Sequence, residues 1–145
     1  MRLLLPCLTL ALLTGAPSGC NRLSGPPQFT QVGITSSQLR PEEVATITIK
    51  VEDANDIVDR IEGFVKENPS VQFSLKDDGQ EADAQAGDGI WSMYVEVPVT
   101  APTGNFELEF TAFRSDGQPI EIRDEDGNAV PLRASVPVNI QSNPE

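Results

Sequence analysis

The chain has 145 residues, with 22 acidic and 10 basic side chains, no histidine and two cysteines, and its formal net charge at pH 7 is −12. This charge repels the phosphates of nucleic acids and therefore excludes them as partners. Without histidine the Ser-His-Asp and Cys-His catalytic arrangements are excluded and zinc sites are disfavoured, so we do not expect an enzyme.

Residues 1–19 have the features of a secretory signal peptide. Arg2 is followed by an apolar run from Leu3 to Leu13 and then by small residues, which correspond to the three regions of an export signal. An apolar run of about eleven residues is too short to span a bilayer of roughly 30 Å as a helix. We therefore expect export through the Sec pathway, followed by cleavage of residues 1–19.

The residues before Cys20 indicate a lipid anchor. Pro17-Ser18-Gly19-Cys20 resembles the lipobox of bacterial lipoprotein precursors, although Pro17 replaces the usual aliphatic residue. The resemblance implies that Cys20 is acylated and begins the mature chain, and two or three acyl chains suffice for stable anchoring in a lipid bilayer. Asn21, where aspartate would retain a lipoprotein in the inner membrane, favours the outer membrane of the cell envelope. A secreted chain with an incidental Cys20 is the alternative.

Residues 20–27 form a short linker after the anchor, and residues 28–142 have the length of one domain. Five segments of this domain alternate apolar and polar side chains with a period of two, which is typical of half-buried strands. Two weaker segments bring the expected number of strands to seven. In chain order, the expected strands are 29–35, 44–52, 61–65, 71–76, 90–97, 106–113 and 132–140.

Turn residues, such as the glycines of Asp77–Gly79 and Gly87–Gly89, separate these segments. Seven short strands in about 115 residues predict an all-β fold, an antiparallel immunoglobulin-like or fibronectin-type-III-like β-sandwich. Trp91 is then expected in the core. Pro137 indicates an edge position or a bulge in the last strand, because proline cannot donate to a strand ladder.

The segment from Leu75 to Phe113 is the most distinctive part of the domain. It reads DDG, an Asp/Gly-rich loop, GDG with a following aromatic residue, and a Pro/Gly turn. It resembles a pattern of immunoglobulin-like modules in exported bacterial proteins, which implies the fold and the compartment but no particular activity. The residues that carry the resemblance are Asp77, Asp78, Gly79, Asp83, Gly87, Asp88, Gly89, Trp91 and Gly104.

The same loop is a candidate site for Ca²⁺, which takes six to eight oxygen ligands. The candidate ligands are Asp77, Asp78, Asp83 and Asp88. Their spacing lacks the EF-hand pattern, and a solvated connection with aspartate turns explains the same residues. We favour the solvated connection and keep Ca²⁺ binding as the alternative. The turn at 124–128 is a weaker candidate of the same kind.

These observations predict a non-catalytic interaction or structural module, held at a lipid bilayer through acylated Cys20 and meeting an unidentified protein partner. No cofactor is expected unless the acidic loop binds Ca²⁺. The alternative is a Ca²⁺- or carbohydrate-binding module of an exported protein. Sugars stack on exposed aromatic rings, and only Tyr94 and Phe113 lie on outward phases of their strands.

Overall fold

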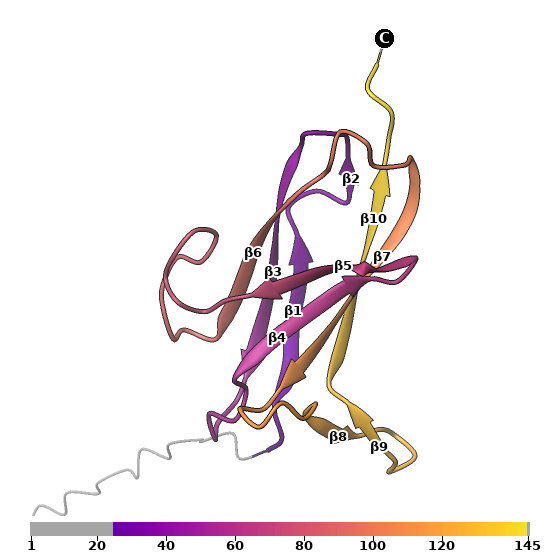
Figure 1. Cartoon of the computed structure of the whole chain (residues 1–145). Helices are drawn as coiled ribbons and strands as arrows, with labels where there is room; N and C mark the ends of the chain where they lie inside the picture. Colours follow the sequence, from indigo (N-terminus) through magenta and orange to yellow (C-terminus); the bar gives the residue numbers. More distant parts are fainter. Residues whose placement is uncertain (1–24, 145) are drawn as a thin grey trace, which may run out of the picture.

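The computed structural model describes residues 25–144, and in this range the chain is all-β, as predicted, with no helix (Figure 1). Accordingly, none of the described residues belongs to a helix that could cross a membrane. The ten strands are β1 (Gln28–Ile34), β2 (Gln38–Leu39), β3 (Val44–Glu52), β4 (Arg60–Val65), β5 (Asn68–Leu75), β6 (Ile90–Glu96), β7 (Gly104–Phe113), β8 (Glu121–Arg123), β9 (Ala129–Pro131) and β10 (Arg133–Ile140).

The strands form three sheets with the orders β1-β3-β6, β2-β10-β7-β4-β5 and β8-β9. The prediction of seven strands was too low. Long strands occupy the predicted segments, and the additional strands β2, β8 and β9 have only two or three residues, too few to produce a recognisable alternation. The expectation of purely antiparallel pairing was also wrong in one place, because β2 pairs in parallel with β10.

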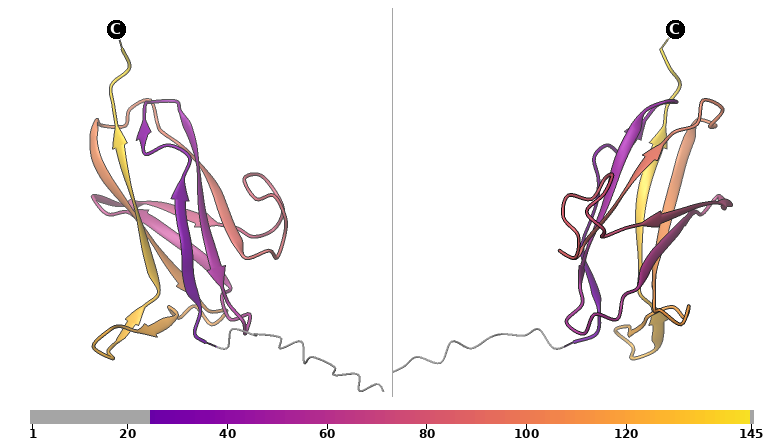
Figure 2. Two further views of the ribbon diagram at one scale, coloured as in Figure 1. Left: turned by 180° about the vertical axis from the view of Figure 1, so that it is seen from behind. Right: turned by 60° about the vertical axis from the view of Figure 1, so that its left-hand side comes forward.

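The two larger sheets lie in two layers, with the core between them (Figure 2). The alternation of β3 buries Ala45, Ile47, Ile49 and Val51 and leaves the residues between them more exposed. The facing sheet contributes buried side chains from β4, β5, β7 and β10: Ile61, Leu75, Leu108, Phe110, Ala112, Val136 and Val138. Burial of these side chains provides the main driving force for folding.

Gly63 of β4 is required by the packing of the second sheet. It lies opposite Phe110 in the register of β4 and β7. A Cβ at position 63 would collide with the Phe110 ring and lie 2.8 Å from the carbonyl oxygen of Glu109. The fully buried Phe110 ring therefore uses the space that a side chain at position 63 would occupy.

The two ends of the sandwich-like body differ in what they carry. Gln28, the first residue of β1, pairs with Glu52 at the end of β3. We call this end proximal; it also carries the loop 53–59 and the β8–β9 hairpin (Figure 1). The C terminus leaves the opposite, distal end.

The signal peptide predicted over 1–19 and the acylation site predicted at Cys20 lie outside the described residues, as does most of the linker predicted over 20–27. Pro27, which the sequence assigned to this linker, is instead buried in the domain. Pro27 therefore packs as part of the domain.

Candidate functional site

The acidic loop, residues 76–89, connects β5 to β6 and is closed at its base. Lys76 and Ser92 exchange two backbone hydrogen bonds: the Lys76 N–H donates to the Ser92 carbonyl at 3.0 Å, and the Ser92 N–H donates to the Lys76 carbonyl at 2.8 Å. Ser92 is buried beneath this bridge. The loop thus leaves and re-enters the body at one fixed point.

Asp77 joins the two ends of the loop. Its Oδ1 accepts the N–H groups of Gly87 at 2.7 Å and Asp88 at 3.2 Å, and its Oδ2 accepts the N–H of Gly89 at 3.0 Å. Both carboxylate oxygens therefore have partners in the returning part of the loop. Hydrogen bonds from three N–H groups to one charged carboxylate are stronger than neutral bonds of the same geometry.

Asp83 closes the first half of the loop. Its side chain is buried, with 6% exposed, and its Oδ2 accepts the N–H of Gly79 at 2.5 Å. Gly79 has a φ of +71°, and a Cβ there would lie 2.9 Å from the backbone nitrogen of Ala86. This position therefore requires glycine, and the DDG pattern reflects a tight turn that Asp83 holds from inside.

Three of the four predicted calcium ligands converge. Asp77, Asp83 and Asp88 each have a carboxylate oxygen within 4.8 Å of those of the other two. Asp78 does not belong to this group: its Oδ1 accepts the N–H of Gln80 at 3.0 Å, and its Oδ2 lies 4.0 Å from the ammonium of Lys76. The converging carboxylates supply three of the six to eight oxygens that Ca²⁺ takes, while backbone N–H groups already satisfy several of these oxygens.

The second acidic turn, residues 124–128, connects β8 to β9. Asp124 Oδ1 accepts the N–H groups of Asn128 at 2.8 Å and Asp126 at 3.0 Å. The bond from the Asn128 backbone lowers the pKa of the Asp124 carboxyl below its ordinary value. These contacts account for the acidic residues as a hairpin turn.

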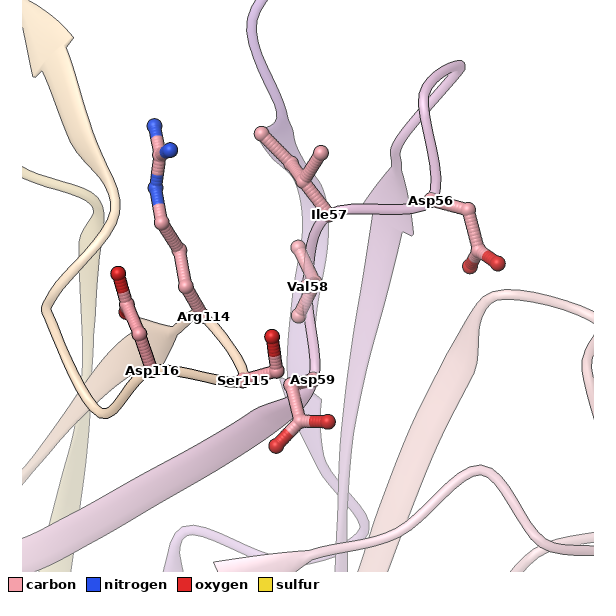
Figure 3. Close-up of a pocket in the computed structure, with 7 residues that line it drawn as sticks. All are labelled: Asp56, Ile57, Val58, Asp59, Arg114, Ser115 and Asp116. Atoms are coloured by element: carbon pink, nitrogen blue, oxygen red, sulfur yellow. The ribbon is translucent and has the colours of Figure 1, made fainter.

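A charged cavity of about 500 Å³ lies at the proximal end (Figure 3). Ile57 and Val58 are half-buried in it, and their N–H groups donate to Asp53 Oδ2 at 2.6 and 2.7 Å. The remaining lining residues are exposed: Asp56, Asp59, Arg114, Ser115 and Asp116. Sequence reasoning missed this cavity because its two walls are loops far apart in the chain, and each resembled an ordinary turn.

An apolar cavity of about 370 Å³ opens between β5 and β6 in the distal half. Its walls come from both large sheets and include the partly exposed Val71, Phe73, Val95 and Phe106. Glu96 is the one charged residue in the lining. We call this cavity the distal cleft.

The aromatic residues do not form one exposed platform. Tyr94 is 53% exposed on β6, and its hydroxyl donates to the carbonyl of Glu81 at 3.2 Å. Phe113 ends β7 in the other sheet and lies under the guanidinium of Arg60, 5.1 Å from the ring centroid. Trp91, which was expected in the core, packs against the core but is only half-buried.

No model of a known protein family matches the sequence, and no curated protein matches it. A Niemann-Pick type C2 protein from the Japanese carpenter ant is 15% identical, aligns over 81% of this chain and 94% of its own, and has a TM-score of 0.47. The endo-β-1,4-mannanase of Thermotoga petrophila is 9% identical over 78% of this chain and 20% of its own, with a TM-score of 0.45. The alkylpurine DNA glycosylase AlkC of Pseudomonas fluorescens is 9% identical over 82% and 31%, with a TM-score of 0.45.

This chain thus spans only 20% of the mannanase and 31% of the glycosylase. At these TM-scores and identities the three likenesses carry no argument about the fold, substrate or partner of this chain. The function has to be argued from its own residues.

Proposed function

We propose that this chain is an exported bacterial lipoprotein, anchored through acylated Cys20, whose single immunoglobulin-like domain is a non-catalytic interaction or structural module of the cell envelope. The observation that carries the proposal is the lipobox-like sequence at 17–20, followed after a short linker by an all-β domain. Asn21 favours the outer membrane.

The strand order supports the immunoglobulin-like part of the proposal. The seven long strands in chain order are β1, β3, β4, β5, β6, β7 and β10. The first, second and fifth of them (β1, β3 and β6) form one sheet. The third, sixth and seventh (β4, β7 and β10) lie together in the other sheet, with the fourth (β5) at its edge. Immunoglobulin constant-type sandwiches also divide strands A, B and E from strands C, F and G, but their fourth strand lies in the sheet of A, B and E, whereas β5 lies at the edge of the other sheet. The small β8–β9 hairpin is an addition to that plan.

The anchor determines how the domain faces the membrane. Eight positions separate Cys20 from Gln28, where β1 begins at the proximal end. A fully extended chain of that length spans at most about 30 Å. The proximal end therefore stays near the bilayer and the distal end projects from it. Confinement to one surface raises the effective concentration of the domain toward partners in the same membrane.

Substitution of each cysteine in turn tests the anchor. We expect Cys20→Ser to abolish incorporation of labelled palmitate and to release the protein from sedimented membranes. Cys7→Ser is the matched control and should behave as the wild type, because Cys7 is removed with the signal peptide. If Cys20→Ser still sediments with membranes as the wild type does, the chain is not held by acyl groups on Cys20.

Calcium binding in the acidic loop is a second candidate function, favoured by the convergence of Asp77, Asp83 and Asp88. Asp83→Asn should abolish the heat of Ca²⁺ binding in calorimetric titration, whereas Asp78→Asn should leave it unchanged because Asp78 lies outside the cluster. Absence of binding heat in the wild type, together with identical melting in Ca²⁺ and in EDTA, would eliminate this candidate.

A further inference from the structure

Strands β5 and β6 meet at one point and then separate. Lys76, directly after β5, and Ser92 of β6 form an isolated antiparallel bridge between the two large sheets. The next pairs in this register would be Ser74 with Tyr94 and Gln72 with Glu96, and within the described part of the chain neither pair forms. The two strands diverge from the acidic loop: β6 runs toward the distal end, whereas β5 crosses the body beside β4 (Figures 1 and 2).

The facing edges of both strands have unpaired backbone groups. Within residues 25–144, β5 pairs only with β4 and β6 pairs only with β3, so each ends its sheet. Backbone groups of successive residues point to opposite edges of a strand. Lys76 and Ser92 point outward, because they bond each other. The N–H and C=O groups of Gln72 and Ser74 in β5, and of Tyr94 in β6, point outward too.

The distal cleft fills the angle between these edges. Val71 and Phe73 of β5 line it, and Val71 is 41% exposed. Its inner wall reaches Leu108 and Val138, which are 5% and 6% exposed. An apolar cleft bordered by free backbone donors and acceptors combines the two elements of strand-addition sites: hydrogen bonds from the edge, and pockets for alternate side chains.

We propose that β5 binds an extended segment of a partner protein as an added strand, and that every second side chain of this segment enters the distal cleft. The inference rests on the proposed function as an interaction module and names the kind of partner. Charge complementarity specifies the segment further. Glu96 is the one charged residue of the cleft and the whole chain carries a charge of −12, so the segment is apolar at alternate positions and has lysine or arginine beside them.

The backbone distinguishes this occupant from a lipid or another alkyl ligand. An alkyl chain would fill the cleft but leave the outward N–H and C=O groups of Gln72 and Ser74 to water. A peptide strand satisfies them. The edge is short and lies beside Glu96, which limits pairing between two copies of this acidic chain, because like charges oppose each other across such an interface.

The probe is a synthetic nonapeptide with alternating valine and threonine and a lysine at each end, titrated into the full chain in detergent. Its matched control carries N-methyl groups on the backbone nitrogens that would pair with β5. Loss of two hydrogen bonds should weaken binding about tenfold or more. The bound peptide should also slow amide hydrogen exchange at Gln72 and Ser74.

Gln72→Pro removes one outward N–H and leaves the ladder to β4 unchanged, so this variant should fold and lose binding. Gln72→Ala keeps the N–H and should bind as the wild type. Glu96→Lys should weaken binding of the lysine-ended peptide and strengthen binding of a glutamate-ended one. If Gln72→Pro fails to fold, the N-methylated peptide still provides the test.

Several results would overturn the proposal: equal binding of the N-methylated peptide, binding of laurate in the cleft with no binding of the peptides, β5-mediated dimers that exclude the peptides, or no peptide binding at millimolar concentration. A photocrosslinker is placed at position 72, and separately at position 56 of the charged proximal cavity. It distinguishes failure of the strand-addition proposal from failure of the proposed function as an interaction module. Partner crosslinks from 56 alone refute strand addition and keep the interaction module. If neither position gives a crosslink to a partner, the result counts against strand addition and against the proposed function as an interaction module.

Discussion

Asp77→Ala removes the acceptor of three backbone N–H groups where the acidic loop returns to β6. A net contribution of about 1.5 kcal/mol is at the low end for a hydrogen bond to a charged group. The carboxylate is only half-buried, so water replaces part of what is lost. We expect the free energy of unfolding to fall by about 2–3 kcal/mol, which in a domain of this size lowers Tm by roughly 8–12 °C.

Asp77→Asn separates the contribution of the hydrogen bonds from that of the charge, and Asp78→Ala is the control. Asp77→Asn keeps one oxygen but presents an amide donor to the remaining N–H, and should lose about half as much stability as Asp77→Ala. Asp78→Ala removes an exposed turn bond to Gln80 and an exposed ion pair with Lys76, and should stay within about 0.5 kcal/mol of the wild type.

Urea denaturation in EDTA, with an unchanged m value, gives these differences directly. If Asp77→Ala stays within about 0.5 kcal/mol of the wild type in EDTA, the loop is not held by these bonds and our account of it is wrong. If the difference appears only when Ca²⁺ is present, the carboxylate acts as a metal ligand rather than as a backbone acceptor.

Two further predictions concern packing and pH. Gly63→Ala should lower the free energy of unfolding, measured in urea, by about 1–3 kcal/mol, because its methyl group collides with the Phe110 ring. Gly33→Ala is the control: the nearest contact of its methyl group is at 3.6 Å, and it should lower the free energy of unfolding by less than about 0.5 kcal/mol. Asp124, whose pKa is lowered mainly by the Asn128 N–H, should stabilise the β8–β9 hairpin fully above pH 3.8 and lose this contribution as pH falls through its lower folded pKa. An NMR titration midpoint at or above 3.8 would contradict this cause.

The core strands were predictable because a two-layered fold buries every second side chain. β3 shows this most clearly: Ala45, Ile47, Ile49 and Val51 are all buried. The position of Pro137 also follows a simple rule, that proline lies where no neighbouring strand needs its N–H. It lies in β10 beside β7, and on its other edge β2 reaches only Asn139 and Ile140, so the missing N–H of proline faces no strand.

The candidate site was predictable only in part. The density of aspartates indicated where carboxylates would gather, but not that Asp78 would turn away toward Lys76. The partners of Asp78 are the Gln80 N–H and the Lys76 ammonium, and only the folded loop brings them to it. The proximal cavity and the distal cleft left no local signal, because each is lined by segments that only the fold brings together.

The opposite placement of the two ends determines how this domain would respond to tension. β1 enters at the proximal end, and β10 leaves at the distal end with its last residues bonded in parallel to β2. A load applied between the proximal start of β1 and the C terminus acts along these strands. It shears each ladder, so that many hydrogen bonds must break together, whereas a load applied across the strands would unzip them one at a time.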